Sequence, residues 1–396
     1  MLQAKRIEEK CTNCGACKDL LPCSGEECAG CGACALLCPS EAIVMEERPP
    51  ERKVEIEVEG RRVEVDAPAT VKRALEQAGY KFSDVPGEGI YSPCGVGGCW
   101  SCAVEVDGEV RPACITPVRE GMKIKLEFED PGPFRLVEGF HGHTVGGVGT
   151  PWHLKKRGRY IEVACFAAGC NFRCPQCQNW TTTYRGKGVP YTPREAALRM
   201  TWARRRFDVD RMAISGGEPT LNRRWLVEYV RELKELNPDP KARIHIDTNG
   251  SILTPDYIDE LVSAGMTDIG IDLKALRVET FMRITGLKDR EKARRYMRTA
   301  WRAVEYILKR YGDRVFLGVG IPYNSALISR DEIREMGERL ARLDPSLQVC
   351  VLDYRPEFRS RIKRPSYEEM RRIHELLRDC GLKTVICQTH LGHIGP

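Results

Sequence analysis

The sequence predicts an α/β protein in which parallel strand–helix units follow two small cysteine-rich modules. From residue 159 onward, short apolar runs alternate with amphipathic stretches, a pattern typical of parallel βαβ units. Before residue 159, cysteines concentrate in two stretches, 11–38 and 94–114. We therefore expect structured regions at 1–48, 52–130 and 159–396, with residues 131–158 as a linker.

The composition is that of a globular protein. The chain has 396 residues, 42% hydrophobic and 30% charged, which allows two or three domains and excludes wholesale disorder. No apolar run approaches the roughly 20 residues that span a bilayer, and the polar stretch 1–10 has no secretion signal. The net charge of +6 is mild and its charges are interspersed. We expect a cytoplasmic protein that binds neither membrane nor nucleic acid.

The 19 cysteines indicate metal binding rather than disulfides, because the chain has no secretion signal. Most of them fall into three groups, and Cys350, Cys380 and Cys387 lie outside these groups. We expect Cys165, Cys350 and Cys387 to be buried small apolar residues. A position of Cys387 near the functional site stays open, and Cys380 is unassigned.

The first module, 1–48, carries two cysteine runs. The second run, C-x2-C-x2-C-x3-C-P, resembles two-cluster bacterial ferredoxins, and the first run lengthens its last gap to five residues. By that resemblance, the fourth cysteine of each run binds the other cluster. One 4Fe-4S cluster would take Cys11, Cys14, Cys17 and Cys38, and the other Cys28, Cys31, Cys34 and Cys23. Because CxxC pairs also bind zinc, two zinc knuckles are the alternative.

The second module, 52–130, combines a predicted hairpin with a four-cysteine set. Residues 54–58 and 62–65 alternate apolar and polar around a Glu-Gly turn, and a helix is expected over 71–78. A C-x4-C-x2-C loop with a later fourth cysteine has plant-type 2Fe-2S spacing: Cys94, Cys99, Cys102 and Cys114. The short last gap resembles the 2Fe-2S domain of succinate dehydrogenase iron–sulfur subunits, which implies a β-grasp fold.

The interval 131–158 is rich in Gly and Pro and is predicted to be a linker. It contains His141, His143 and His153. A His-x-His pair could bind metal, but we expect these side chains to be polar loop residues.

The third module, 159–396, alternates predicted strands and helices. Strands are expected at 160–164, 212–215, 244–247, 269–273, 315–320 and 348–352, with 384–387 as a further candidate. Helices are expected at 194–206, 223–236, 255–264, 290–311, 329–342 and 367–379.

A CxxxCxxC triplet follows the first of these strands. Cys170, Cys174 and Cys177 can bind three irons of a 4Fe-4S cluster and leave the fourth iron open. This spacing, followed by Gly216-Gly217-Glu218-Pro219, resembles radical S-adenosylmethionine (SAM) enzymes. The resemblance implies a partial (β/α)6 barrel, functional loops at the C-terminal strand ends, and an open iron that binds the amino and carboxylate groups of SAM.

The Gly-Gly-Glu motif is expected to help hold SAM. Gly216 and Gly217 permit close backbone approach, and Glu218 can accept hydrogen bonds from the SAM ammonium. A simple strand-end turn is the alternative.

Two further motifs resemble those of glycyl-radical-enzyme activating enzymes, such as the pyruvate formate-lyase activating enzyme. They are Asp247-Thr248-Asn249-Gly250 and Asp272-Leu273-Lys274, and residues 281–286 continue the pattern. By that resemblance, Asp247, Thr248 and Asp272 bind a monovalent cation, Asp247 and Asn249 belong to the SAM site, and Lys274 pairs with the SAM carboxylate. Helix capping is the alternative for the acids.

The chain also departs from that family. Gln176 stands where most members carry an aromatic residue against adenine, and Trp180 is a candidate replacement. Activating enzymes with extra ferredoxin clusters carry them after the triplet, whereas here they precede it.

The sequence thus predicts a radical SAM enzyme with three 4Fe-4S clusters and one 2Fe-2S cluster. The N-terminal clusters would relay electrons from a low-potential donor to the triplet. SAM would yield a 5′-deoxyadenosyl radical that abstracts hydrogen, expected from a protein in the manner of an activating enzyme. The alternatives are a small molecule or cofactor precursor as substrate, and an electron-transfer protein that does not cleave SAM.

Overall fold

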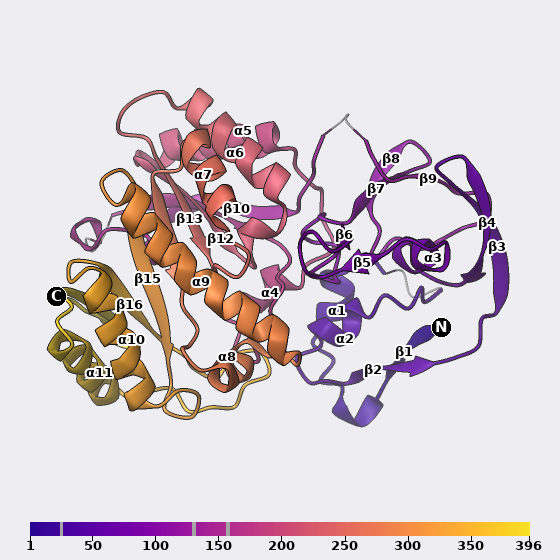
Figure 1. Cartoon of the computed structure of the whole chain (residues 1–396). Coiled ribbons are helices and arrows are strands. Elements are labelled where there is room, and N and C mark those ends of the chain that lie inside the picture. Colours follow the sequence, from indigo (N-terminus) through magenta and orange to yellow (C-terminus); the bar gives the residue numbers. More distant parts are fainter. Residues whose placement is uncertain (24–26, 129–131, 156–158) are drawn as a thin grey trace.

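The computed structural model describes residues 1–23, 27–128, 132–155 and 159–396. The two cysteine-rich modules lie together on one side of the molecule, and the strand–helix module forms the other side (Figure 1). The expected domain limits at 130, 131 and 158 fall outside the described residues.

The first module consists of one antiparallel pair of strands and two short helices. Strand β1 (Leu2–Arg6) pairs antiparallel with β2 (Ile43–Glu47). Helices α1 (Ala16–Asp19) and α2 (Ala33–Leu37) each begin after a glycine with positive φ, Gly15 or Gly32. These glycines make the sharp turn that lets a cysteine-bearing loop run directly into a helix.

The second module is a five-stranded sheet, in the order β4-β3-β9-β7-β8, packed on one helix. The strands are β3 (Arg52–Val58), β4 (Arg61–Ala67), β7 (Ala103–Val106), β8 (Glu109–Pro112) and β9 (Lys123–Lys125). Helix α3 (Val71–Gln77) begins at Thr70, whose side chain accepts a hydrogen bond from the Arg73 amide. A short parallel pair, β5 (Phe82–Ser83) and β6 (Ile90–Tyr91), completes the module. The predicted hairpin, helix and ferredoxin-like architecture are confirmed.

The third module is a nine-stranded sheet whose strands follow one another in sequence order, from β10 to β18. Its strands are β10 (Val137–His143), β11 (Glu162–Ala167), β12 (Arg211–Gly216), β13 (Arg243–Thr248), β14 (Asp268–Asp272), β15 (Phe316–Tyr323), β16 (Gln348–Asp353), β17 (Thr384–Thr389) and β18 (Gly392–Ile394). Strands β11 to β17 are parallel, while β10 and β18 pair antiparallel at the two edges. This is the predicted partial barrel.

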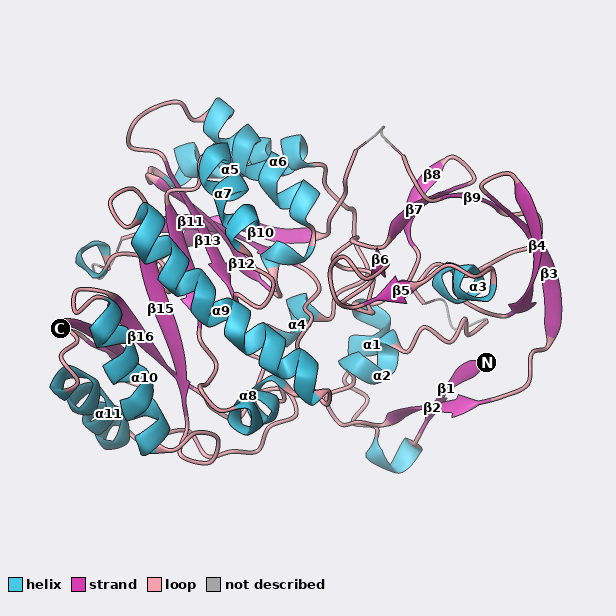
Figure 2. Cartoon of the chain, viewed as in Figure 1, coloured by secondary structure: helices cyan, strands magenta, loops and turns pink. Residues whose placement is uncertain are grey.

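Helices cover the outer face of this sheet (Figure 2). They are α5 (Pro193–Phe207), α6 (Arg223–Leu236), α7 (Pro255–Ala264), α9 (Arg290–Tyr311), α10 (Arg330–Leu343) and α11 (Tyr367–Asp379), while the short helices α4 (Trp180–Thr183) and α8 (Val278–Thr285) pack near the triplet. Capping boxes begin α5 and α11, and the buried apolar residues of α9 recur every three or four positions. Within the described residues, no helix is both long and apolar enough to cross a membrane.

The candidate run 384–387 is confirmed as part of β17, the seventh parallel strand of the barrel. Two details of the barrel differ from the sequence prediction. The first strand starts at Glu162 and extends to Ala167, beyond the predicted 160–164. Helices α4 and α8 were not predicted, because they are too short for a clear apolar period.

The expected linker is a structural part of the barrel, which corrects the prediction for residues 132–155. Strand β10 pairs with β11, so His141 and His143 lie on a strand rather than in a loop. Residues 146–150, here called the internal loop, then enter the barrel. The high glycine content of this stretch was the reason for predicting a linker. In the structure, the glycines are needed because larger side chains would not fit inside the barrel.

The internal loop is held from several strands. Gln348 donates from Nε2 to the carbonyls of Val148 (3.1 Å) and Thr150 (3.0 Å). A Cβ atom on Gly318 would lie 2.1 Å from the Val148 carbonyl oxygen, so β15 must carry glycine there. The internal loop therefore fills the N-terminal half of the barrel, and glycines on both partners make room for it.

Charged groups lie buried beneath the internal loop. His245 contacts Asp247 (Nε2 to Oδ1, 3.0 Å) and lies 3.4 Å from Glu162 (Nδ1 to Oε2). Arg211 pairs with Asp268 at 2.9 Å. Burial disfavours charge on His245, but Asp247 and Glu162 outweigh it and raise its pKa to about 9. Burial opposes ionisation of Glu162 too, yet His245 and Arg211 lower its pKa to about 2.

These pKa shifts predict a specific pH dependence of stability. Stabilisation by His245 is complete below its ordinary pKa of 6.5 and is lost as pH rises through about 9. Stabilisation by Glu162 is complete above its ordinary 4.5 and is lost as pH falls through about 2. The unfolding free energy of the wild type should therefore fall by on the order of 1–3 kcal/mol between neutral and alkaline pH, and His245→Gln should not show this fall. Urea unfolding across pH measures both.

The control is His153→Gln, because His153 is exposed. It should retain the alkaline loss. A His245→Gln protein whose pH profile matches that of the wild type would show that the network does not store this energy.

Candidate functional site

The cysteine triplet lies on the loop between β11 and α4, at the C-terminal end of the barrel. Cys170 and Cys174 pack at the edge of an apolar cluster that includes Phe172 and Phe281. Burial raises the pKa of the Cys174 thiol to about 12, and the nearby Lys274 acts in the opposite direction. In the part of the chain that is described, no group of three or more His, Cys, Asp or Glu side chains is spaced for a metal ion. Ligation by the cysteine sets stays a prediction.

The Gly-Gly-Glu segment packs backbone to backbone against the start of the triplet loop. The amide of Gly217 donates to the Ala167 carbonyl and that of Glu218 to the Gly169 carbonyl, both at 2.8 Å. A Cβ on Gly217 would lie 2.3 Å from the Gly169 oxygen, and one on Gly216 would lie 2.6 Å from the Ala167 nitrogen. The glycines are therefore required by this loop–loop contact, a reason that the sequence motif alone did not give.

Glu218 is fully buried, and its carboxylate is occupied by protein donors. Oε1 accepts from the amide and hydroxyl of Thr220 and from the Thr248 hydroxyl at 2.6 Å. Oε2 accepts from the Asn249 amide at 2.7 Å. Burial raises the pKa of Glu218, and these hydrogen bonds oppose the rise. Its contacts join the loops after β12 and β13 and differ from the expected contact with the SAM ammonium.

Asn249 lies beside the triplet. Its Nδ2 donates to Asn171 Oδ1 at 3.0 Å and lies 3.9 Å from Cys170 Sγ. Asn171 in turn donates to the Ser251 hydroxyl at 2.8 Å. This buried amide chain fixes the loop after β13 against the triplet loop.

Lys274 forms the cationic side of the site. Its ammonium donates to Asp272 Oδ2 at 3.0 Å and to the Tyr354 hydroxyl at 2.9 Å. Burial opposes its charge, but Asp272, Tyr354 and Cys174 raise the pKa of Lys274 well above its ordinary value. The amine is therefore a permanent positive charge near the triplet. Tyr354 was not predicted; its one signal was its position just after the strand 348–352.

The three expected cation ligands are not equally placed. Asp272 remains partly exposed beside Lys274. Thr248 uses its hydroxyl to bind Glu218 and to accept from the Gly250 amide. Asp247 lies deeper, where it pairs with His245 and accepts from the Gly149 amide of the internal loop at 3.4 Å. The sequence motif did not reveal the deeper contact because the internal loop was taken for a linker.

The aromatic residues near the triplet form a stack. Trp180 stacks on Phe358 with ring centroids 5.4 Å apart, and Tyr184 contacts the same ring at 5.2 Å. Gln176 is buried and donates to the Ile284 carbonyl at 2.7 Å. Trp180 is therefore close to the triplet, as expected, but one face of its ring is taken by Phe358.

The four cysteines of the second module are divided between two apolar clusters: Cys102 and Cys114 lie in the core of the module, and Cys94 and Cys99 lie in the cluster beside the triplet. The Cys114 and Cys99 thiols lower the pKa of Cys94 well below its usual value, and Cys114 lowers the pKa of Cys102. All four are buried. Four buried thiols are the ligand type of a 2Fe-2S cluster, and ligation by these four stays a prediction.

The 2Fe-2S-type loop touches the triplet loop directly. A Cβ on Gly169, the residue before Cys170, would lie 2.8 Å from the Cys99 nitrogen and 3.0 Å from the Cys94 Cβ. Arg173 adds a bridge, because its guanidinium donates to the carbonyls of Cys94 (2.8 Å) and Cys170 (2.7 Å). The second module therefore presents two of its cysteines to the functional site.

The first module docks through Arg359, in the loop after β16. Its guanidinium donates to the carbonyls of Ala35 (2.7 Å), Leu36 (3.0 Å) and Cys38 (3.0 Å) at the end of α2. Its own amide donates to the Pro175 carbonyl, inside the triplet, at 2.9 Å. One residue thus links a predicted ferredoxin ligand to the triplet loop, and nothing in the sequence pattern had indicated it.

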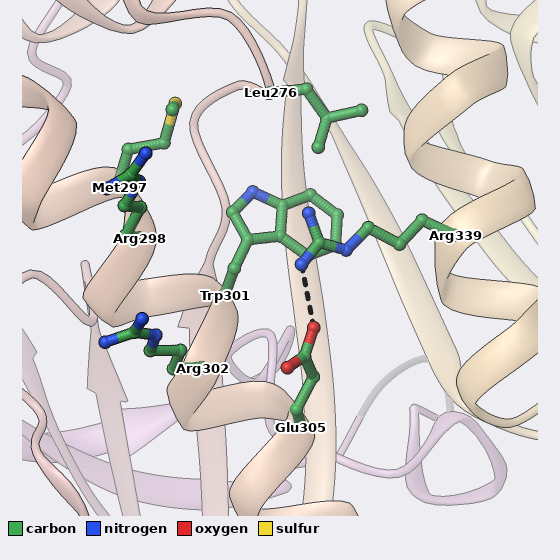
Figure 3. Close-up of a pocket in the computed structure, with 7 residues that line it drawn as sticks. All are labelled: Leu276, Met297, Arg298, Trp301, Arg302, Glu305 and Arg339. Atoms are coloured by element: carbon green, nitrogen blue, oxygen red, sulfur yellow. Dashed lines mark hydrogen bonds and ion pairs between the residues drawn. The ribbon is translucent and has the colours of Figure 1, made fainter.

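Two hollows of about 410 and 300 Å³ lie elsewhere, on the outer face along α9. Arg339 stacks over Trp301 in the larger one and pairs with Glu305, while Leu276 borders it (Figure 3). None of the predicted site residues lines either hollow. Cys165, Cys350 and Cys387 are buried, as expected, and Cys380 is partly buried.

Comparisons with known families agree with two of the three modules. Residues 165–326 match the family described as the radical SAM superfamily. Residues 51–128 match the family described as the 2Fe-2S iron-sulfur cluster binding domain.

Among curated relatives, a probable GTP 3′,8-cyclase from Saccharolobus solfataricus is 26% identical over 225 residues, which are 56% of this chain and 65% of that protein. A probable GTP 3′,8-cyclase from Thermoplasma volcanium is 30% identical over 123 residues, 31% of this chain and 35% of that protein. The chain thus spans less than two thirds of the curated relatives it matches, and their names are those of cyclases rather than activating enzymes.

Among solved structures, a radical SAM methyltransferase from Sphaerobacter thermophilus is 21% identical and covers 58% of this chain and 67% of its own, with a TM-score of 0.41. SuiB from Streptococcus suis bound to S-adenosylmethionine is 16% identical and covers 57% of this chain and 46% of its own, with a TM-score of 0.40.

Glu218→Gln tests whether the Glu218 carboxylate is a brace within the protein. A glutamine amide would face donors that now meet a carboxylate oxygen, so the unfolding free energy of the SAM-free protein should fall by about 1–3 kcal/mol in urea titration. Glu228→Gln, on the surface of α6, is the matched control and should change it little. Equal stability of the two variants would mean that Glu218 is free for a ligand.

Proposed function

Because residues 165–326 carry a radical SAM region and residues 51–128 a 2Fe-2S ferredoxin-like region, we propose that the chain is a radical SAM enzyme with an internal electron relay. The observation that carries the proposal is the meeting of two cysteine-bearing loops, the triplet loop and the 2Fe-2S-type loop, at Gly169. The Gly-Gly-Glu motif, Asn249 and Lys274 surround the same point.

The donor set fits the implied cluster. Cys170, Cys174 and Cys177 would hold a 4Fe-4S cluster at the C-terminal end of the barrel and leave one iron without a protein ligand. When bound, such a cluster supplies the electron that splits SAM into methionine and a 5′-deoxyadenosyl radical. Lys274 would neutralise the SAM carboxylate, since its ammonium is buried and close to Cys174.

The Gly-Gly-Glu segment would act through its backbone. Since the Glu218 carboxylate is bound by Thr220, Thr248 and Asn249, and the Gly216 carbonyl accepts from the Asn179 side chain, the part left for the SAM ammonium is the Gly217 carbonyl. Asn249 would contact SAM from the loop after β13. Asp272 and Asp247 would supply oxygen ligands to a monovalent cation, and Thr248 would contribute only its carbonyl.

The relay is supported by packing. Cys17 and Cys34 of the first module, Cys94 and Cys99 of the second, and Cys170 of the triplet adjoin one apolar cluster. Electrons from a low-potential donor would enter at the exposed cysteines of the first module, which include Cys14, Cys23 and Cys31. The first module would hold two 4Fe-4S clusters and the second module one 2Fe-2S cluster.

The source of the abstracted hydrogen has two candidate classes. Because the internal loop fills the N-terminal half of the barrel, hydrogen transfer would take place near the C-terminal strand ends, where an extended protein substrate could reach. This favours the protein substrate expected from the activating-enzyme motifs. The relatives named as probable GTP cyclases favour the small-molecule alternative.

A single-turnover experiment tests the cleavage. Reduced protein, freed of reductant and mixed with SAM, should form 5′-deoxyadenosine, and Cys174→Ala should form less than about a hundredth as much. Cys380→Ala, outside every cysteine group, should match the wild type. If the wild type forms none, the chain is an electron carrier.

The same experiment measures the relay. If the N-terminal clusters store electrons, each chain should form more than one 5′-deoxyadenosine. Cys114→Ala should lower that yield because the 2Fe-2S site loses a ligand. A wild-type yield that never exceeds one would contradict the relay and leave the cleavage intact. Deuterium recovered in 5′-deoxyadenosine from labelled peptides or labelled nucleotides then separates the two substrate classes.

A further inference from the structure

One arginine of the former linker is buried at the junction of all these loops. Arg135 precedes β10, and its backbone exchanges two hydrogen bonds with Tyr191 (3.1 and 2.8 Å). The next residue, Leu136, donates from its amide to the carbonyl of Gly98 in the 2Fe-2S-type loop at 3.2 Å. The segment thus passes between the second module and the barrel, and it carries the Arg135 side chain inward.

The Arg135 guanidinium is 0% exposed and meets only backbone oxygens. It donates to the carbonyls of Pro219 (2.5 Å), Glu218 (2.6 Å) and Ala168 (3.1 Å). Its Nε has no hydrogen-bond partner within the described part of the chain. Among the described residues, no carboxylate lies within ion-pair distance of it. A buried guanidinium keeps its charge, so this cation lacks the partner that buried charges normally have.

Arg135 differs in this respect from the other buried arginine of the barrel. Arg211 lies between Glu162 and Asp268, and both carboxylates face it. Arg173, which also approaches the 2Fe-2S-type loop, is only partly buried.

The cysteine-bearing loop of the second module lies next to Arg135. Ala168, whose carbonyl accepts from the guanidinium, packs against Gly98, and Gly169 packs against Cys99. Burial lowers the pKa of Arg135, whereas Cys99, then Glu218, Tyr257 and Cys94, act in the opposite direction. Cys94 and Cys99 belong to the four buried cysteines predicted to bind a 2Fe-2S cluster. A cluster held by four thiolates is anionic, and reduction adds one negative charge to it.

We propose that Arg135 is the charge partner of the 2Fe-2S cluster, raises its reduction potential, and ties its charge to the loops that carry the triplet and the Gly-Gly-Glu motif. The physical reason is that a fixed cation in a poorly solvated site stabilises the more negative, reduced cluster more than the oxidised one. Arg135 is a positioning and tuning residue, since it reaches the reacting groups through the backbone of Ala168 and Glu218.

The inference rests on the 2Fe-2S part of the proposed function, and its test needs neither SAM nor substrate. The 2Fe-2S couple is titrated by EPR in the full-length, reconstituted protein. At the ambient potential where the wild-type cluster is half reduced, Arg135→Gln should lower the ratio of reduced to oxidised cluster about tenfold. For a one-electron couple, this is a shift of about 59 mV to lower potential. Arg211→Gln, the buried control at the opposite end of the barrel, should leave the couple in place.

Arg135→Lys keeps the charge and loses the planar fork that holds three carbonyls. At the same ambient potential, its ratio of reduced to oxidised cluster should stay within about a factor of two of the wild type. This variant still tests the inference if Arg135→Gln fails to load its cluster. An unchanged couple in Arg135→Gln, or a tenfold change in Arg135→Lys, would overturn the inference. A wild-type protein without any 2Fe-2S signal would instead refute the cofactor proposal.

Discussion

The close backbone contact of three loops around Gly169 is the constraint on which the rest of the site depends. Gly169 lies against the cysteine-bearing loop of the second module, and its carbonyl accepts from the Glu218 amide. A side chain on Gly98 or Gly217 would collide with residues 168 and 169. Glycine at these positions allows separations that no other residue permits. The triplet, the Gly-Gly-Glu motif and the second module therefore take their relative positions from backbone contact rather than from long side chains.

The side chains around this contact are mostly engaged with the protein itself. Glu218 and Asn249 brace neighbouring loops, Arg135 holds carbonyls of two loops of the barrel, and Arg359 holds carbonyls of the first module. Buried polar groups have to be satisfied, and here each satisfied group also joins two loops. A site built in this way is rigid before any ligand arrives, which suits a reaction that depends on fixed positions of donor and acceptor.

The interior of the barrel shows how the chain restricts the space available to a substrate. Inward-facing glycines on β14 and β15 leave a volume that the internal loop occupies. The charged network of Glu162, His245 and Asp247 lies under that loop and anchors it. The interior of the barrel beside these strands is thereby occupied by the chain itself.

The sequence by itself determined the modules, the order of strands and helices, and the cysteine groups, because apolar periodicity and ligand spacing are local properties of a chain. The helices at 223–236, 255–264, 290–311 and 367–379 have the predicted bounds. Only the tertiary structure decided that residues 137–150 belong to the barrel, that Glu218 is enclosed, and that Arg173 and Arg359 join the modules. These features depend on contacts between residues far apart in the sequence, and a glycine-rich stretch or a lone arginine carries no local pattern that reveals its distant partner.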